Sequence, residues 1–230
     1  MGDWYLNTSL FLPFQQLNTL FLGGNRIAGW FALLSGYELQ RLRNLDYLDL
    51  RSNSFDNSIL SFVEGFPSLK SLYLSYNKLE GLIDLKESLS SLEVLGLSGN
   101  NINKLIASRG PSNLTTLFLN NITTYESRFQ LLQSLETFPN LTTLYLRFND
   151  FRGRILGDGF LDLKNLEYLD LSYNTLNNSI FQAIKMMTSL KTLILRSCKL
   201  DGRIPIAQGL CDLNNLQELH VYDNDLSASV

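Results

Sequence analysis

The side chains that could carry out catalysis are few, and their positions keep them apart. The 230 residues include one histidine, His220, and two cysteines, Cys198 and Cys211. A thiol and an imidazole act as nucleophile and base only when they lie within hydrogen-bond reach of each other. His220 stands between two apolar residues of an expected strand and should point outward, whereas Cys198 takes a position that should face inward. We therefore expect no Cys/His pair, and we expect Cys211 to be a small, buried apolar residue.

The carboxylates give no catalytic pair either. Asp49 and Asp170 are expected on the same exposed strand face, but five repeats apart, which is roughly 24 Å at about 4.8 Å per strand. The two carboxylates of a glycoside hydrolase are only about 5–9.5 Å apart. The segment Gly157-Asp-Gly159 has no phosphate-binding context, and no metal-ligand spacing occurs in the sequence. The sequence therefore predicts no enzyme, no cofactor and no metal.

The elements that position these residues come from an internal repeat. The pattern L-x-x-L-x-L-x-x-N, with valine once in place of the third leucine, begins at Leu17, Leu45, Leu69, Leu92, Leu141, Leu166 and Leu216. Two further copies, which begin at Leu114 and Leu190, carry Ile122 and Cys198 in place of the asparagine. The second leucines of successive copies are 22 to 28 residues apart. A period of this length and composition is the signature of a leucine-rich repeat.

Each copy of the repeat predicts one short strand. Two leucines that alternate with exposed residues form the period-2 pattern of a strand with one buried face. The asparagine after the strand has two donors and an acceptor for buried backbone groups, so stacked asparagines should form a ladder through the core. We predict an α/β repeat fold, a leucine-rich-repeat solenoid of about nine coils with a concave parallel sheet, in which residues 1–230 form one domain.

The segments between the strands predict an irregular convex side with short helices. Ile180-Ile184-Met187 and Phe129-Leu132-Leu135 have helical spacing. Glycine or asparagine recurs four residues after the ladder position, at Gly29, Asn57, Gly81, Gly153, Asn178 and Gly202. Both residue types tolerate a positive φ, so we predict a left-handed turn at each of these positions. Lys104 and Ala228 break this rule, and their coils should be strained or turned differently.

The overall composition argues against nucleic-acid and membrane binding. The net charge is −3, the isoelectric point is near 5.2, and no cluster of lysine and arginine occurs. The apolar stretches are far shorter than the roughly 20 residues of a membrane span. The N-terminal residues have neither the basic flank and apolar core of a signal peptide nor the Ser or Thr of a myristoylation site. We expect no nucleic-acid partner, and neither a signal peptide nor a transmembrane segment in this chain.

The exposed strand positions predict a binding surface. Aromatic residues and arginine gather there, and these types dominate binding hot spots. Adjacent strands should bring the side chains of three successive coils together on the concave face. Aromatic residues also suit strands for packing alone, so the alternative is that the rings only stiffen the sheet. The predicted ligand-binding residues are Phe118, Tyr145, Arg147, Phe148, Tyr168, Tyr73 and Arg196.

Sequons for N-glycosylation are frequent in this chain. The pattern N-x-[S/T] occurs at Asn7, Asn113, Asn121, Asn140 and Asn177. Asn113 and Asn140 share the position just before a predicted strand. We predict these five asparagines as glycosylation sites of a secreted protein.

Several phrases resemble the plant-specific leucine-rich repeats. They are Leu48-Asp-Leu-Arg-Ser-Asn53, Leu169-Asp-Leu-Ser-Tyr-Asn174, Leu74-Ser-Tyr-Asn-Lys-Leu-Glu-Gly81 and Gly209-Leu-Cys-Asp-Leu-Asn-Asn-Leu216. The resemblance covers nearly the whole chain and is closest to plant receptor-like proteins. It implies the extracellular face of the plasma membrane, a peptide, glycan or protein ligand, a co-receptor kinase as partner, and a role in defence or developmental signalling.

Two other functions fit the same repeat. One is a secreted enzyme inhibitor of the polygalacturonase-inhibitor kind, and the other is a cytosolic leucine-rich-repeat scaffold. The family's signal peptide, paired-cysteine cap, transmembrane helix and terminal capping repeat are not found in these 230 residues. We therefore interpret the chain as a leucine-rich-repeat domain that is truncated at both ends.

Overall fold

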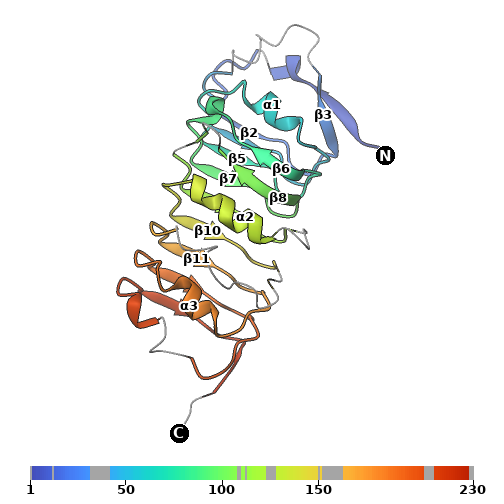
Figure 1. The fold of residues 1–230 in the computed structure, drawn as a ribbon. Coiled ribbons are helices and arrows are strands. Elements are labelled where there is room, and N and C mark those ends of the chain that lie inside the picture. The colour runs from blue at the N-terminus through green and yellow to red at the C-terminus, as the bar shows by residue number, and fades with distance from the viewer. Residues whose placement is uncertain are drawn as a thin grey trace.

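The chain forms a solenoid in which each coil adds one strand to a parallel sheet. The computed structural model describes residues 2–11, 13–31, 42–107, 110–111, 113–122, 128–149, 151, 163–204 and 210–227. In this part of the chain the coils stack into an elongated body with the two termini at opposite ends (Figure 1). The short helices α1 (Ile59–Val63), α2 (Arg128–Ser134) and α3 (Ile180–Ile184) lie on the side away from the sheet. The predicted solenoid fold is confirmed.

The main sheet has nine strands of three residues each. Their spatial order follows the sequence, and the strands are β2 (Thr19–Phe21), β4 (Tyr47–Asp49), β5 (Ser71–Tyr73), β7 (Val94–Gly96), β9 (Thr116–Phe118), β10 (Thr143–Tyr145), β11 (Tyr168–Asp170), β12 (Thr192–Ile194) and β14 (Glu218–His220). The central leucines of neighbouring strands are register partners, as with Leu48 and Leu72. Every coil therefore points the same repeat positions into the core and the same positions outward. We call the outward side of this sheet the sheet face.

The core is a stack of leucines. Leu48, Leu72, Leu95, Leu144 and Leu169 are all 0% exposed. Burying a leucine side chain contributes about 1.5–3 kcal/mol relative to leaving it in water. Because each coil buries its leucines only against its neighbours, this stacking is what holds the solenoid together.

The predicted asparagine ladder is confirmed. Nδ2 of Asn100 donates to the carbonyl of Leu97 at 2.8 Å and to that of Leu74, in the preceding coil, at 3.0 Å. Oδ1 of Asn100 accepts the backbone N–H of Leu79 at 3.1 Å. The same donation to the preceding coil is made by Asn53, Asn77, Asn149, Asn174 and Asn224. One amide thus satisfies the backbone of two coils at once.

The left-handed turns are only partly where the sequence placed them. Gly81 and Gly202 have φ of 66° and 61°, as predicted. The prediction is wrong for Gly29, Asn57 and Asn178, which do not have a positive φ. Gly29 lies in a strand, and the two asparagines instead use their amides to donate to a carbonyl of the following coil. Gly153 and Ala228 lie outside the described residues.

A second left-handed position is more regular than the predicted one. The residue directly before each ladder position has a positive φ in all nine coils. These residues are Gly24, Ser52, Tyr76, Gly99, Asn121, Phe148, Tyr173, Ser197 and Asp223. Only two of them are glycine, so the residue types gave no signal for this turn.

The convex side contains more strands than the sequence predicted. Three two-stranded parallel sheets pair β1 (Trp4–Asn7) with β3 (Ile27–Phe31), β6 (Glu80–Asp84) with β8 (Asn101–Ile106), and β13 (Asp201–Gly202) with β15 (Asp225–Leu226). Lys104 lies in β8, after a register shift relative to β6, so its coil is turned differently as expected. The 3-10 segments among the described residues are η1 (Thr8–Phe11), η3 (Glu87–Leu89), η4 (Leu135–Thr137) and η7 (Leu210–Asp212).

The two predicted convex helices are present as α2 and α3. All four apolar residues of α3, Ile180, Phe181, Ala183 and Ile184, are buried. No helix in the described part of the chain is long and apolar enough to cross a membrane.

Candidate functional site

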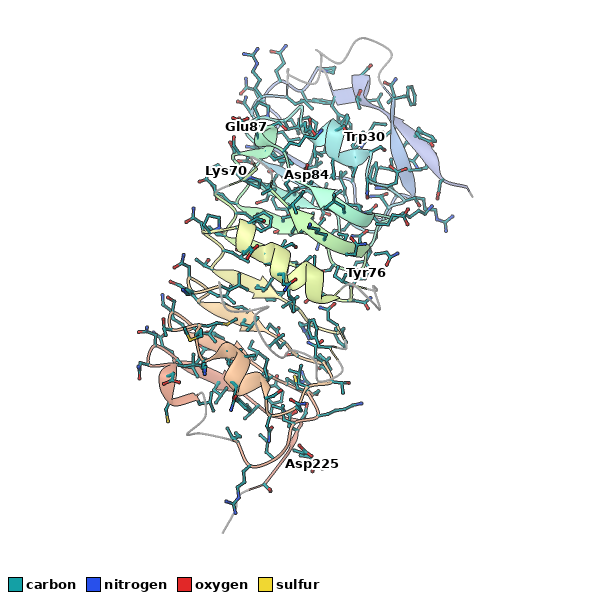
Figure 2. The ribbon with its side chains drawn as sticks, viewed as in Figure 1. Trp30, Lys70, Tyr76, Asp84, Glu87 and Asp225 are labelled. Atoms are coloured by element: carbon teal, nitrogen blue, oxygen red, sulfur yellow. The ribbon has the colours of Figure 1, made fainter. Side chains whose placement is uncertain are left out.

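Three repeat positions supply the side chains of the sheet face. Within each coil these are the residue before the central leucine, the residue after it, and the third residue after it. In the coil of Leu48 they are Tyr47, Asp49 and Arg51. The next residue, Ser52 in this coil, lies in the left-handed turn at the carboxyl end of the strand. The amino and carboxyl ends of the strands lie on opposite sides of the solenoid, as Lys70 and Tyr76 show on either side of β5 (Figure 2).

A continuous row of aromatic rings crosses the sheet face. Its neighbouring ring centroids are 5.1, 5.3, 6.2, 4.5 and 5.0 Å apart. We call this set the aromatic row, and its members in order are Phe21, Tyr47, Tyr73, Phe118, Tyr145 and Tyr168. The row spans seven strands, from β2 to β11, although β7 contributes no ring.

Two local features keep the row continuous. Gly96 in β7 has no side chain, and Tyr73 leans over it, so that a Cβ at Gly96 would lie 2.9 Å from the Tyr73 ring. Tyr73 and Phe118 thereby come within reach across an intervening strand. In the coils with aspartate after the central leucine, the residue before that leucine is tyrosine, as in Tyr47 and Tyr168. In these two coils the ring thus comes from a position two residues earlier in the repeat, and the row stays continuous.

The rings of the row partly bury one another. Phe118 and Tyr145 are nearly parallel, with 9° between their planes. Burial, the largest cause, raises the pKa of Tyr73 above its usual value of 10.0. Burial is also the largest cause of the strongly raised pKa of Tyr168, with the neighbouring Tyr145 adding to it. These phenols stay protonated at neutral pH and keep their hydrogen-bond donors.

The two aspartates of the sheet face are structural. Asp49 is 5% exposed and forms a two-oxygen ion pair with the Arg51 guanidinium, with contacts of 2.6 to 3.0 Å. Burial acts against the charge on Asp49, but the hydrogen bonds from Arg51 outweigh it and lower the pKa of the carboxyl below 3.8. Oδ1 of Asp170 accepts the backbone N–H and the hydroxyl of Ser172 at 2.9 and 2.5 Å. Each carboxylate is thus bound to a residue of its own coil and not to the other carboxylate.

The structure divides the predicted binding residues between two neighbouring groups. Tyr73, Phe118, Tyr145 and Tyr168 come together in the aromatic row. Phe148 lies apart from it, because it occupies a left-handed turn with φ 59° and stacks on Tyr173, with centroids 4.4 Å apart. Its predicted place on the concave strand face is therefore corrected. Ligand binding by these residues remains a prediction.

The two predicted arginines belong with Phe148 at the carboxyl ends of the strands. The Arg147 guanidinium carbon lies 5.7 Å from the centroid of Phe148 and 5.5 Å from that of Tyr173. Arg196 lies 5.3 Å from the Tyr173 centroid and 4.9 Å from that of Tyr222. Nε of Arg147 also lies 3.7 Å from the carboxylate of Asp170, which is in the same strand as Tyr168 of the aromatic row.

His220, Cys198 and Cys211 lie in three different environments. Nε2 of His220 lies 3.3 Å from a Glu218 carboxylate oxygen on the sheet face. Cys198 is fully buried in the ladder, its thiol donates to the carbonyl of Leu171, and burial raises its pKa to about 11. Cys211 is exposed, so the prediction that it is buried is wrong: it lies in η7 at the surface of the outer segment. Gly157 to Gly159 lie outside the described residues.

No group of three metal-binding side chains occurs among the residues whose positions are described.

The sequons differ in how accessible they are. Asn113, Asn121, Asn140 and Asn177 are exposed. Asn7 is half-buried in β1, and the next residue, Thr8, is 4% exposed. Nδ2 of Asn113 donates to the carbonyl of Ser90 in the preceding coil. Four of the five predicted sites thus present their side chains at the surface.

Four rings of the two groups were not among the predicted binding residues, and they are Phe21, Tyr47, Tyr173 and Tyr222. Tyr47 has the same repeat position as the predicted Tyr168, and Tyr173 has that of the predicted Phe148. Comparing all repeat positions on both sides of the strand would have found them. The left-handed conformation that turns Tyr173 toward Phe148 could not be found in this way, because tyrosine rarely adopts it.

Known proteins share both this sequence pattern and this fold. The leucine rich repeat family model matches residues 43–102 and 139–200, more than half of the chain. Receptor-like protein 9a of Arabidopsis thaliana is 44% identical over 101 residues, which cover 43% of this chain and 11% of that protein. Cuscuta receptor 1 of Solanum lycopersicum is 32% identical over 219 residues, covering 85% of this chain and 19% of that protein. The chain thus spans about a tenth to a fifth of the length of these relatives.

A solved structure extends the likeness to three dimensions. The crystal structure of PEPR1-AtPEP1 aligns with 97% of this chain and 31% of its own, with a TM-score of 0.51 and 26% sequence identity. The repeat pattern, the nine-stranded sheet and the relatives agree with one another. The chain belongs to the leucine-rich repeat family and is homologous to plant receptor-like proteins.

Proposed function

We propose that the sheet face binds an extended polypeptide segment along the aromatic row, as the ligand-sensing part of an extracellular receptor-like protein. The observation that carries this proposal is the continuity of the row over seven strands. At about 4.8 Å per strand the row is roughly 29 Å long. An extended peptide of about nine residues has the same length at about 3.3 Å per residue.

The orientation of the rings favours a peptide over a glycan. A sugar ring packs its C–H face flat against an exposed aromatic face. Phe118 and Tyr145 stack face to face, with centroids 4.5 Å apart, and the other neighbouring rings of the row are tilted against each other by 42 to 48°. We propose that a ligand contacts mainly the rims of these rings and their phenol hydroxyls. Rims and hydroxyls suit the side chains and amide groups of a polypeptide, because they offer apolar contact and hydrogen bonds side by side.

Relatives and accessible sequons support an extracellular setting. The receptor-like proteins of Arabidopsis thaliana and Cuscuta receptor 1 are named as receptors. Asn113, Asn140 and Asn177 are exposed and carry the acceptor pattern. Release of N-glycans from chain secreted by plant cells should lower the mass of the tryptic peptides that contain these asparagines. Unmodified asparagine at all three would favour the cytosolic scaffold instead.

The ligand class can be tested by selection. The 230-residue chain is immobilised and presented with a random peptide display library and, in parallel, with a glycan array. We expect peptides rich in apolar and hydrogen-bonding side chains to be enriched, and no glycan to bind at comparable strength. Recovery of glycans alone, or of neither class, would contradict the proposal.

A further inference from the structure

A second set of exposed rings and guanidinium groups lies at the carboxyl ends of strands β10, β11, β12 and β14. We call it the turn array, and its members are Arg147, Phe148, Tyr173, Arg196 and Tyr222. Phe148 and Tyr173 occupy left-handed turns, whereas Arg147, Arg196 and Tyr222 stand one residue before such a turn. The array therefore lies along the carboxyl ends of these strands, beside the aromatic row and not within it.

The array combines a stacked pair of rings with two guanidinium groups that contact aromatic rings. Phe148 and Tyr173 are parallel within 4°, at 4.4 Å. The Arg147 carbon is 5.7 and 5.5 Å from their two centroids, so this guanidinium lies beside the stacked pair and not between the rings. The Arg196 carbon bridges Tyr173 and Tyr222 at 5.3 and 4.9 Å. Aromatic contact holds both guanidinium groups in place without neutralising them.

Arg147 and Arg196 form weaker ion pairs within the chain than Arg51 does. Arg51, at the same repeat position, contacts both oxygens of Asp49 through Nε and a terminal nitrogen at 2.6 to 3.0 Å. Arg147 reaches Asp170 only at 3.7 Å, and its buried Nε has no hydrogen-bond partner. Arg196 contacts Asp223 at 3.1 Å through Nε, and 38% of the Arg196 side chain and 55% of the Asp223 side chain are exposed. Such an exposed pair contributes little and can exchange its partner.

The rings beside these charges are unusually open. Phe148 and Tyr222 are each 51% exposed. Exposed aromatic side chains next to arginine are the composition of a binding hot spot. The terminal nitrogens of Arg147 and Arg196 make no hydrogen bond with any described residue. The array thus presents two donor forks and an apolar surface to the solvent.

We infer that the turn array is a separate docking surface for an acidic polypeptide segment, one that carries carboxylate side chains next to apolar ones. Carboxylates fit the planar fork of a guanidinium better than other common side chains do. The apolar neighbours would cover Phe148 and Tyr222. The turn array is a different surface from the aromatic row, so the docking of an acidic segment there is tested separately from the proposed function.

The test uses two peptides that differ only in charge. One alternates leucine and aspartate over eight residues, and the other alternates leucine and asparagine. Both are titrated into chain with isotope-labelled tyrosine, and the tyrosine resonances are followed. We expect the acidic peptide to shift the signals of Tyr173 and Tyr222 in a salt-sensitive manner, and the asparagine peptide to bind at least about fivefold more weakly.

Two substitutions of equal charge give the matched comparison. Arg196→Gln should weaken the acidic peptide at least about fivefold. Lys191→Gln removes the same charge from the same coil, at the amino end of the strand, where Lys191 is exposed and pairs with Glu167. It should leave the affinity unchanged. Lys191 is exposed and Arg196 is half-buried, and far-ultraviolet circular dichroism checks that both variants fold.

Three results would overturn the inference. The asparagine peptide could bind as well as the acidic one, Arg196→Gln could bind like the unmodified chain, or the shifts could centre on Tyr145 and Tyr168. The last result would place acidic peptides on the aromatic row. Failure of the display selection, in contrast, would contradict peptide binding to the aromatic row and would not affect the docking proposed for the turn array.

Discussion

At the scale of single residues, each ladder asparagine satisfies several buried backbone groups at once. Nδ2 of Asn174 donates to Leu171 and Leu146 at 2.6 and 2.9 Å, and Oδ1 accepts the N–H of Asn149 at 2.7 Å. Asn174 is 1% exposed, so water cannot replace these bonds. Removing the amide therefore leaves buried backbone groups in two coils unpaired.

We predict that Asn174→Ala and Asn77→Ala each lower the free energy of unfolding by about 1–3 kcal/mol, because buried donors and acceptors lose their partner. Urea denaturation of each variant measures the change. Asn215→Ala is the control, since this exposed asparagine makes one bond, to the carbonyl of Thr188. Unchanged stability in both ladder variants would contradict the role assigned to the ladder.

The Asp49–Arg51 pair makes a pH-dependent contribution to stability. The folded chain holds the pKa of Asp49 below 3.8, its ordinary value. The stabilisation is therefore fully present above pH 3.8 and is lost as the pH falls through the lowered pKa of the folded state. We predict that Asp49→Asn destabilises the chain at pH 7 and that the difference from the unmodified chain shrinks below pH 3.8. A difference that stays constant down to pH 2 would show that the carboxylate charge is not its source.

At the scale of elements, strand β7 shows how a glycine shapes the sheet face. The Tyr73 ring lies over Gly96, and a Cβ there would come within 2.9 Å of it. Gly96→Ala should push the ring away from Phe118 and divide the aromatic row. Because an exposed-side ring can move, we expect less than about 1 kcal/mol loss of stability but at least about fivefold weaker binding of display-selected peptides.

A double-mutant cycle checks this cause. In the Tyr73→Ala background the ring that Gly96→Ala displaces is gone, so adding Gly96→Ala should have no further effect on peptide affinity. An undiminished effect in that background would mean that the glycine acts through something other than Tyr73.

The elements that the sequence predicted are those with a periodic apolar face. The nine strands and helices α2 and α3 bury leucine, isoleucine or phenylalanine at regular spacing, which any single coil reveals. The strands β6 and β8 were not predicted, because they depend on pairing between coils, as with Ile83 and Leu105. Tertiary contacts of this kind leave little trace in one segment.

The candidate site was predictable to a similar degree. Alternation along each strand placed Tyr73, Phe118 and Tyr145 on one face. The turn geometry that separates Phe148 from them depends on a positive φ, which phenylalanine does not signal. The link from Tyr73 to Phe118 also depends on Gly96, whose effect is visible only when the neighbouring strands are in place.

At the scale of the whole molecule, the two ends of the stack differ from its middle. Leu219 in β14 is 38% exposed, whereas Leu193 in the neighbouring β12 is 0% exposed. β2 and β14 also form the outer edges of the nine-stranded sheet. Exposed leucine beside an edge strand favours association with another copy.

We predict that the 230-residue chain self-associates at tens of micromolar and that Leu219→Glu reduces this association. The added charge should disfavour apolar contact at that end. Light scattering of both proteins measures the effect. A monodisperse monomer of the unmodified chain at that concentration would contradict the prediction.

If a ligand binds along the aromatic row, substitutions within the row must weaken binding and substitutions on the opposite side must not. The most direct measurement is the affinity of display-selected peptides for Tyr145→Ala, Arg147→Ala and Gln182→Ala, by calorimetry. Tyr145 is in the row, Arg147 adjoins it, and Gln182 is exposed on α3, on the opposite side of the solenoid. We predict a loss of about 2 kcal/mol, or roughly thirtyfold, for Tyr145→Ala, a smaller loss for Arg147→Ala, and no change for Gln182→Ala. Unchanged affinity in the first two variants, with their fold intact, would place the binding site elsewhere and contradict the account.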